Sequence, residues 1–143
     1  MKIILDTNVI TKDYSLQGGR ILKLSDAAKK LGYEVFIPEV VVDEIIHQYR
    51  EELQEAHHRY LKGVSSLGRM GFEVKTATED DFIEKSIEDK EKKYLKRLNE
   101  LGIKVLPYPS TKHNDIVKKE LFGKKPFANS QKGYRDSLIW ETV

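Results

Sequence analysis

The sequence predicts an α/β protein built on a mostly parallel sheet. Residues 3–5, Ile-Ile-Leu, form a short apolar run that is typical of a strand buried on both faces. A helical pattern over residues 17–31 and a second apolar run over residues 33–37 follow it. A strand, a helix and another strand in this order form the unit that builds parallel sheets through a right-handed crossover.

The first half of the chain supplies two predicted helices. In residues 17–31, apolar side chains recur at the i, i+3, i+4 and i+7 positions of one buried face, and Gly32 is expected to end this helix. Pro38 then opens a second helix, because proline is favoured in a first helical turn. The helical period continues to about Leu67.

The second half of the chain continues the alternation of predicted helices and strands. Residues 71–75 are expected to form a short extended segment, and Thr78 is expected to cap a helix that runs to Gly102. Residues 103–106 are predicted to form another short buried strand. A short helix capped by Ser110 and a last helix over residues 132–140 complete the prediction.

Composition limits the class of protein. A chain of 143 residues is predicted to form one domain, with 39% hydrophobic and 34% charged residues as in a soluble globular protein. No apolar run approaches the roughly 18 residues that cross a membrane, and the early first strand leaves no room for a signal peptide. The absence of cysteine excludes disulfides and thiolate zinc sites. These features predict a cytoplasmic protein with no membrane partner.

The net charge of +2 hides an asymmetry along the chain. Residues 112–135 contain seven Lys or Arg against Asp115 and Glu120, so this segment carries +5 and the rest of the chain −3. A basic segment beside acidic clusters suits a polyanionic substrate held near metal ions. A solvated face with incidental charge explains the same pattern equally well.

Three acidic residues are predicted to lie at one edge of the sheet. Asp6 directly follows the first strand, Glu44 lies in the second turn of the helix after the second strand, and Asp136 begins the last helix. Because ligands of open α/β sheets bind outside the carboxyl ends of the strands, we expect these carboxylates to share a cleft. Asp43 points about 100° away from Glu44 and is expected to be solvated. The alternative for Asp6 is a cap for a helix that starts near Asn8.

Such a set of carboxylates suits a metal site. Hard divalent cations such as Mg²⁺ and Mn²⁺ prefer oxygen ligands and retain bound water. Three or four carboxylates at a cleft hold one or two such ions, which stabilise the attacking and leaving oxygens of phosphodiester cleavage. The placement of the carboxylates after alternating strands therefore predicts metal-dependent phosphodiester chemistry.

The sequence resembles the PIN domain family at three motifs. Residues 3–10, Ile-Ile-Leu-Asp-Thr-Asn-Val-Ile, resemble its opening motif of a hydrophobic strand, Asp, a small hydroxyl residue, then Asn or Ser. Residues 38–45, Pro-Glu-Val-Val-Val-Asp-Glu-Ile, are similar to the second motif, in which the Glu is a metal ligand. Residues 133–140, Gly-Tyr-Arg-Asp-Ser-Leu-Ile-Trp, resemble the third motif of a PIN-like subfamily with a Lys-Pro-Phe loop just before it. The resemblance runs in order along the whole chain.

The resemblance implies a three-layer α/β/α fold with a central, mostly parallel sheet, and the activity of a metal-dependent endoribonuclease. It implies Mg²⁺ or Mn²⁺ as the cofactor, single-stranded RNA as the substrate and, for a toxin-type member, an antitoxin partner. It also assigns roles to six residues. The catalytic metal ligands are Asp6, Glu44 and Asp136, the residues that position Asp6 or the substrate are Thr7 and Asn8, and Arg135 contacts phosphate. In a ribonuclease, Lys124, Lys125 and Lys132 are expected to bind backbone phosphates together with Arg135.

The chain departs from the family pattern at its end. PIN domains usually have a further strand after the third motif, which brings a fourth acidic or polar residue to the site, whereas this sequence ends at Val143. Glu141 lies within the last predicted helix and is a poor substitute. We therefore expect the last strand of the fold to be missing and cleavage to be low or absent. We also expect either a partner on the short sheet edge, such as a second copy, or poor order of the last residues.

Two other functions compete with the nuclease. A catalytically incomplete RNA-binding or regulatory PIN-like module would keep the fold without a complete site. The missing fourth ligand favours this module, whereas the three intact carboxylates argue against it. The phosphatases with an Asp nucleophile also begin with a buried strand that ends in Asp, but they need a second Asp two residues later as the general acid. Asn8 occupies that position here, which argues against a phosphatase.

Overall fold

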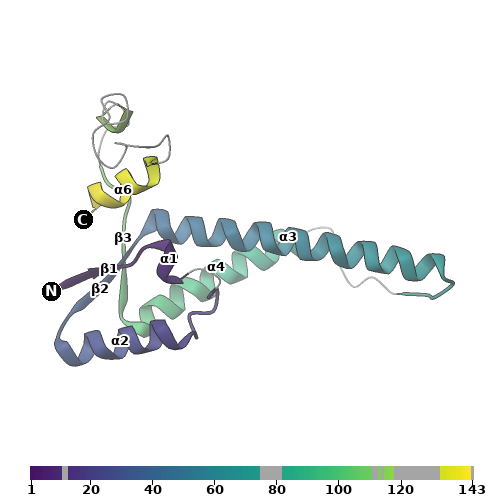
Figure 1. Cartoon of the computed structure of the whole chain (residues 1–143), viewed down its shortest axis with the longest axis horizontal. Helices are drawn as coiled ribbons and strands as arrows, with labels where there is room; N and C mark the ends of the chain where they lie inside the picture. Colours follow the sequence, from purple (N-terminus) through teal and green to yellow (C-terminus); the bar gives the residue numbers. More distant parts are fainter. Residues whose placement is uncertain (11–12, 75–81, 111–112, 114, 118–132, 143) are drawn as a thin grey trace.

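Three parallel strands form the sheet in the computed structural model of the chain (Figure 1). The strands are β1 (Lys2–Ile4), β2 (Glu34–Pro38) and β3 (Ile103–Leu106), and β2 lies between the other two. Both pairings are parallel, which confirms the predicted α/β class. The structure describes residues 1–10, 13–74, 82–110, 113, 115–117 and 133–142.

The register places apolar side chains beside one another across the sheet. Ile3 pairs with Val35, and Val35 pairs with Ile103 on the other side. The backbone N–H of Leu5 donates to the carbonyl of Phe36 at 2.8 Å, so the contact between the two strands continues one residue past β1. The chain therefore leaves the sheet directly before position 6, at the carboxyl end of β1.

Helix α2 (Gly19–Leu31) connects β1 to β2 after the single turn of α1 (Thr7–Ile10). It begins two residues later than predicted, because the carboxylate of Asp13 accepts the backbone N–H groups of Gln17 and Gly18 at 3.1 and 2.8 Å and holds them in a turn. It ends at Gly32 as predicted, with a φ of 66° that glycine adopts without strain.

Helices α3 (Glu39–Arg69) and α4 (Phe82–Leu101) pack against each other beside the sheet, and α3 extends well beyond the start of α4 (Figure 1). Their shared core includes Val41 and Ile45 of α3 with Tyr94 and Leu98 of α4. The apolar stripe of α4 is buried along the helix, whereas in α3 the buried residues end at Ile45. The predicted period of α3 to about Leu67 is helical, but Tyr60 and Leu67 are each 43% exposed, because α3 extends beyond the helix that covers it (Figure 1). The last helix, α6 (Tyr134–Thr142), contacts α3.

Two predictions about burial were wrong. In β1, Ile3 and Ile4 are only half-buried, and in β3, Lys104 and Val105 are exposed. Within the described residues β1 and β3 are the outer strands, so each is covered less completely than β2, of which residues 35–38 are all buried.

Other predicted elements fall outside the sheet or outside the described residues. Residues 71–74 join no strand of the sheet. Thr78 and most of the helix expected after Ser110 are not described. Among the described residues, no helix is both long enough and apolar enough to span a bilayer.

The packing of α4 predicts the effect of truncating Leu98. Its side chain is 0% exposed in the core between α3 and α4, so Leu98→Ala should lower the free energy of unfolding by about 2–5 kcal/mol. Leu95→Ala is the matched control, because Leu95 lies on the same helix and is 40% exposed, and its cost should stay below about 1 kcal/mol. Chemical denaturation measures both values, and equal losses would show that this stripe is not the core.

Candidate functional site

An open cleft of about 740 Å³ lies where the chain leaves β1 and where α3 and α6 begin. Its polar wall comes from three segments that are far apart in the sequence. The carboxylates, amides and guanidinium that line it belong to Asp6, Asn8, Glu44, Gln48, Arg135 and Asp136. The structure thus brings the three predicted carboxylates to one cleft at the carboxyl edge of the sheet.

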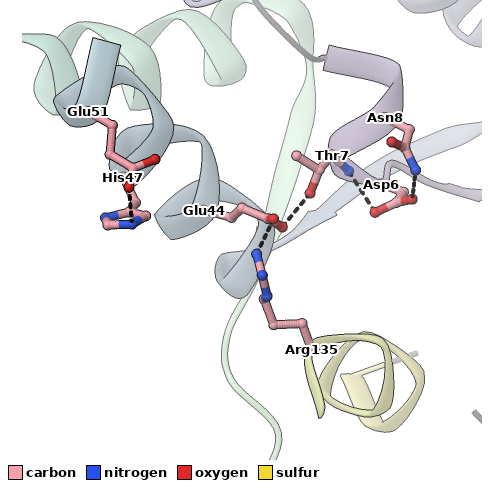
Figure 2. Close-up of polar contacts among 7 residues, drawn as sticks. All are labelled: Asp6, Thr7, Asn8, Glu44, His47, Glu51 and Arg135. Atoms are coloured by element: carbon pink, nitrogen blue, oxygen red, sulfur yellow. Dashed lines mark hydrogen bonds and ion pairs between the residues drawn. The ribbon is translucent and has the colours of Figure 1, made fainter. Parts of the chain in front are cut away.

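Asp6 is exposed at the start of α1, directly after the buried Leu5. Its Oδ1 accepts the backbone N–H of Thr7 at 2.7 Å, and its Oδ2 accepts the side-chain amide of Asn8 at 3.0 Å (Figure 2). A helix cap would instead accept an N–H from the second or third helical residue. Each oxygen of Asp6 therefore has one local donor that orients it and keeps a further lone pair for a ligand.

Glu44 is the most enclosed carboxylate of the cleft. Its Oε2 accepts a hydrogen bond from Thr7 Oγ1 at 2.7 Å, and its Oε1 accepts one from Arg135 Nη1 (Figure 2). The Glu44 side chain is 21% exposed, whereas that of Arg135 is 62% exposed. Asp43 is exposed, so the predicted inward and outward directions of this pair are confirmed.

The first turns of α3 are held from outside by Tyr108, which follows β3. Its hydroxyl donates to Asp43 Oδ2 at 2.5 Å, and its backbone N–H donates to Glu39 Oε2 at 3.1 Å. Burial and the neighbouring Asp43 carboxylate raise the pKa of Tyr108 to about 12. Through these contacts, the segment that follows β3 is bound to α3, the helix that carries Glu44.

Asp136 enters the cleft from the first turn of α6. In the first turn of this helix, the backbone N–H of the buried Ser137 donates to the Gly133 carbonyl at 2.8 Å. A second, mainly apolar hollow of about 350 Å³ lies next to the cleft. It is lined by Ile4, Asp6, Asp136, Ile139 and Trp140.

Two residues of the cleft were missed by the sequence reasoning. Gln48 follows Glu44 by four residues, and this helical spacing would have placed both on one face. Tyr134 precedes Arg135 at the start of α6, and its hydroxyl shares a hydrogen bond of 2.9 Å with His113 Nδ1. Of the predicted cations, Arg135 lines the cleft, whereas the lysines at 124, 125 and 132 lie outside the described residues.

The chemistry of the cleft fits a hard divalent cation, since carboxylate and amide oxygens are the preferred ligands of Mg²⁺ and Mn²⁺. The described side chains, however, are not arranged as a preformed metal site. Within the part of the chain that the structure describes, no group of three or more His, Cys, Asp or Glu side chains is placed to hold a metal ion. Each oxygen of Glu44 accepts one hydrogen bond, from Thr7 and from Arg135. Because the guanidinium of Arg135 is positively charged and would repel a cation at the same oxygen, Glu44 would have to lose this partner before it could become a ligand.

Comparison with known proteins adds one finding about the whole chain. A sequence model described as the PIN domain matches residues 3–143. This match contains all three segments that line the cleft. No curated protein and no solved structure matches the chain significantly.

The contacts of Tyr108 predict a pH-dependent contribution to stability. Tyr108→Phe removes the hydrogen bond to Asp43 and should lower the free energy of unfolding by about 0.5–1 kcal/mol at pH 8. Because the folded state raises the pKa to about 12 from its ordinary value of 10, this contribution is complete below pH 10 and is lost as the pH rises toward 12. Denaturation curves of both proteins from pH 8 to 11.5 measure the difference, and a difference that grows with pH would refute this interpretation.

Proposed function

Because the chain belongs to the PIN domain family, whose members are generally metal-dependent nucleases, we propose that it is an endoribonuclease that cleaves single-stranded RNA with Mg²⁺ or Mn²⁺. We propose that residues 1–143 form a single domain and that the enzyme acts in the cytoplasm. A toxin-type ribonuclease controlled by an antitoxin is one biological setting for this activity. The observation that carries the proposal is the convergence of Asp6, Glu44 and Asp136 on one cleft.

The three carboxylates are the residues that would hold the cation. When bound, the ion supplies Lewis-acid stabilisation of the charge on phosphate oxygens. Asn8 and the backbone of Thr7 orient Asp6, and the Thr7 hydroxyl orients Glu44. These contacts support a positioning role for both residues, since a carboxylate held by its neighbours keeps its geometry without a ligand.

The proposed substrate is supported by the cations of the last part of the chain. Arg135 lines the cleft beside the carboxylates, and its guanidinium has the planar fork that binds phosphates. Lys124, Lys125 and Lys132 precede it in the sequence and are proposed to bind further phosphates of the RNA backbone. The cleft is open, which suits a flexible single strand.

The alternative function is a catalytically incomplete RNA-binding or regulatory module. Two observations favour it: the described residues contain no group of three or more His, Cys, Asp or Glu side chains placed to hold a metal ion, and Glu44 is paired with Arg135. This module would bind RNA through the same cations without cleaving it. A cleavage assay with and without a divalent cation separates the two functions.

The nuclease proposal predicts that Asp6→Asn abolishes cleavage. The variant should lower the rate of Mn²⁺- or Mg²⁺-dependent cleavage of a single-stranded RNA by about 100-fold or more, as the loss of one preorganised catalytic group commonly does. It should leave the melting temperature unchanged or raise it, because like charges crowded in a cleft repel each other.

Asp26→Asn is the matched control for this variant. Asp26 is exposed on α2 and does not line the cleft, so this variant loses the same charge and should keep full activity. Full activity of Asp6→Asn, or equal activity of the parent protein in a chelator, would reject a metal-dependent mechanism.

We further propose that a second copy of the chain covers the free side of β1. Among the described strands β1 pairs only with β2, so its other edge is open for pairing. Trp140 is 73% exposed and lines the apolar hollow with Ile139 and with Ile4, the last residue of β1. An open strand edge next to exposed apolar side chains is typical of an interaction surface.

This partner proposal predicts that Trp140 stabilises a homodimer. Trp140→Ser should weaken self-association by about tenfold or more in sedimentation equilibrium, since buried tryptophans dominate many interfaces. Phe72→Ser is the control, because Phe72 is similarly exposed at 63% but follows the far end of α3. A protein that stays monomeric at every concentration would contradict the homodimer.

A further inference from the structure

We infer that Arg135 is a movable counter-ion, which neutralises Glu44 until a divalent cation binds there and then contacts a phosphate of the RNA. The inference rests on the proposed function, because it requires a cation and RNA to share this cleft. The two oxygens of Glu44 face different donors. Thr7 Oγ1 donates to Oε2, and Arg135 Nη1 donates to Oε1 (Figure 2).

The two partners of Glu44 differ in how firmly they are held. Thr7 is buried, with 7% of its surface exposed, and belongs to the turn of α1 that also orients Asp6. The Arg135 side chain is 62% exposed and reaches Glu44 from α6 through a long flexible stem. A guanidinium that is already largely hydrated leaves its partner at little desolvation cost. Arg135 is therefore the partner that can be exchanged.

Glu44 itself needs a positive neighbour. Its carboxylate is 21% exposed, and a carboxylate with so little water around it is costly to leave without compensating charge. A divalent cation supplies that charge, but a guanidinium and a cation on the same oxygen repel each other strongly. Binding of the cation at Glu44 is therefore an exchange for Arg135, and it is consistent with the lack of a preformed metal group among the described residues.

Because of the geometry of α6, the Arg135 side chain can leave Glu44 without moving Asp136. Successive helical residues point about 100° apart, so Arg135 faces Glu44 while Asp136 lines the hollow shared with Asp6. The released guanidinium stays at the cleft, because its Cα is fixed in the first turn of α6. Its five N–H donors match the oxygens of a phosphate. Release from Glu44 thus creates a phosphate-binding group at the proposed RNA site.

The exchange couples the two ligands. Binding of the cation frees Arg135 for the phosphate, and a phosphate that holds Arg135 leaves Glu44 open to the cation. By thermodynamic linkage, each ligand must then strengthen the binding of the other by the same factor. A permanent structural salt bridge between Arg135 and Glu44 would produce no such coupling.

The first test is the affinity for Mn²⁺ measured by isothermal titration calorimetry on the full chain without RNA. Arg135→Gln removes the competing charge, so its Mn²⁺ affinity should be tighter than that of the parent protein by about tenfold to hundredfold, or about 1.4–2.8 kcal/mol. Arg59→Gln is the matched control, because Arg59 is 70% exposed on α3 and pairs only loosely with Glu55, at 3.9 Å. Its affinity should stay within about twofold of the parent value.

The outcomes of the titration separate the inference from the proposed function. Measurable Mn²⁺ binding by the parent protein, with equal or weaker binding by Arg135→Gln, would overturn the counter-ion inference and leave the metal-dependent nuclease standing. Mn²⁺ binding by Arg135→Gln alone would support the inference. Binding by neither protein would overturn the metal site of the proposed function and the inference with it. Circular dichroism of each variant confirms that it is folded.

The second test is the coupling to RNA, which a merely structural ion pair would not produce. Fluorescence anisotropy with a 2′-O-methyl single-stranded oligonucleotide, which resists cleavage, measures RNA affinity with and without Mn²⁺. In the parent protein Mn²⁺ should tighten binding by about threefold or more, and Arg135→Gln should lose most of this gain. An equal gain in both proteins would overturn the role of Arg135 as a phosphate ligand.

Discussion

The carboxylate of Glu44 links three segments that the sequence keeps far apart. Thr7 lies 37 residues before it and Arg135 lies 91 residues after it, and each donates to one of its oxygens. The parallel sheet makes this possible, because β1 and β2 end on the same side and deliver α1 and α3 to one edge. A single charged group at the cleft therefore contacts both the start of α1 and the start of α6 from α3.

This dependence explains why the cleft is both ordered and adaptable. The hydroxyl of Thr7 and the amide of Asn8 hold the carboxylates of Glu44 and Asp6 through short, local or buried contacts. The exposed guanidinium of Arg135 instead balances charge, and ion pairs that water reaches hold their partners weakly. In the proposed nuclease, fixed ligands together with an exchangeable counter-charge would let one cleft accept both a cation and a polyanion.

The strands, the helices and part of the cleft could be predicted from the sequence, because burial leaves recognisable patterns of apolar residues. The strands ending at Ile4 and Pro38 stood out as apolar runs, and the stripes of α3 and α4 as helical periods, since burial imposes both patterns. The convergence of Asp6 and Glu44 on one edge followed from the parallel connection of β1 and β2. Asp136 was placed there by its position in the first turn of the last helix, which no described strand directly precedes. The pairing of Arg135 with Glu44 was not readable, because a contact across 91 residues leaves no periodic trace. Edge exposure of β1 was missed for the same reason, as it depends on what lies beside the strand.

The free edge of β1 and the cleft are parts of one surface. Asp6 and Asp136 line both the polar cleft and the apolar hollow that contains Ile4 and Trp140. Any chain that covers the hollow must therefore come next to two of the three carboxylates and reduce their contact with water. Removing water strengthens every electrostatic interaction of these groups, including their attraction for a cation. The proposed second copy would therefore both cover this edge of the sheet and strengthen the electrostatic interactions of Asp6 and Asp136, which line both hollows.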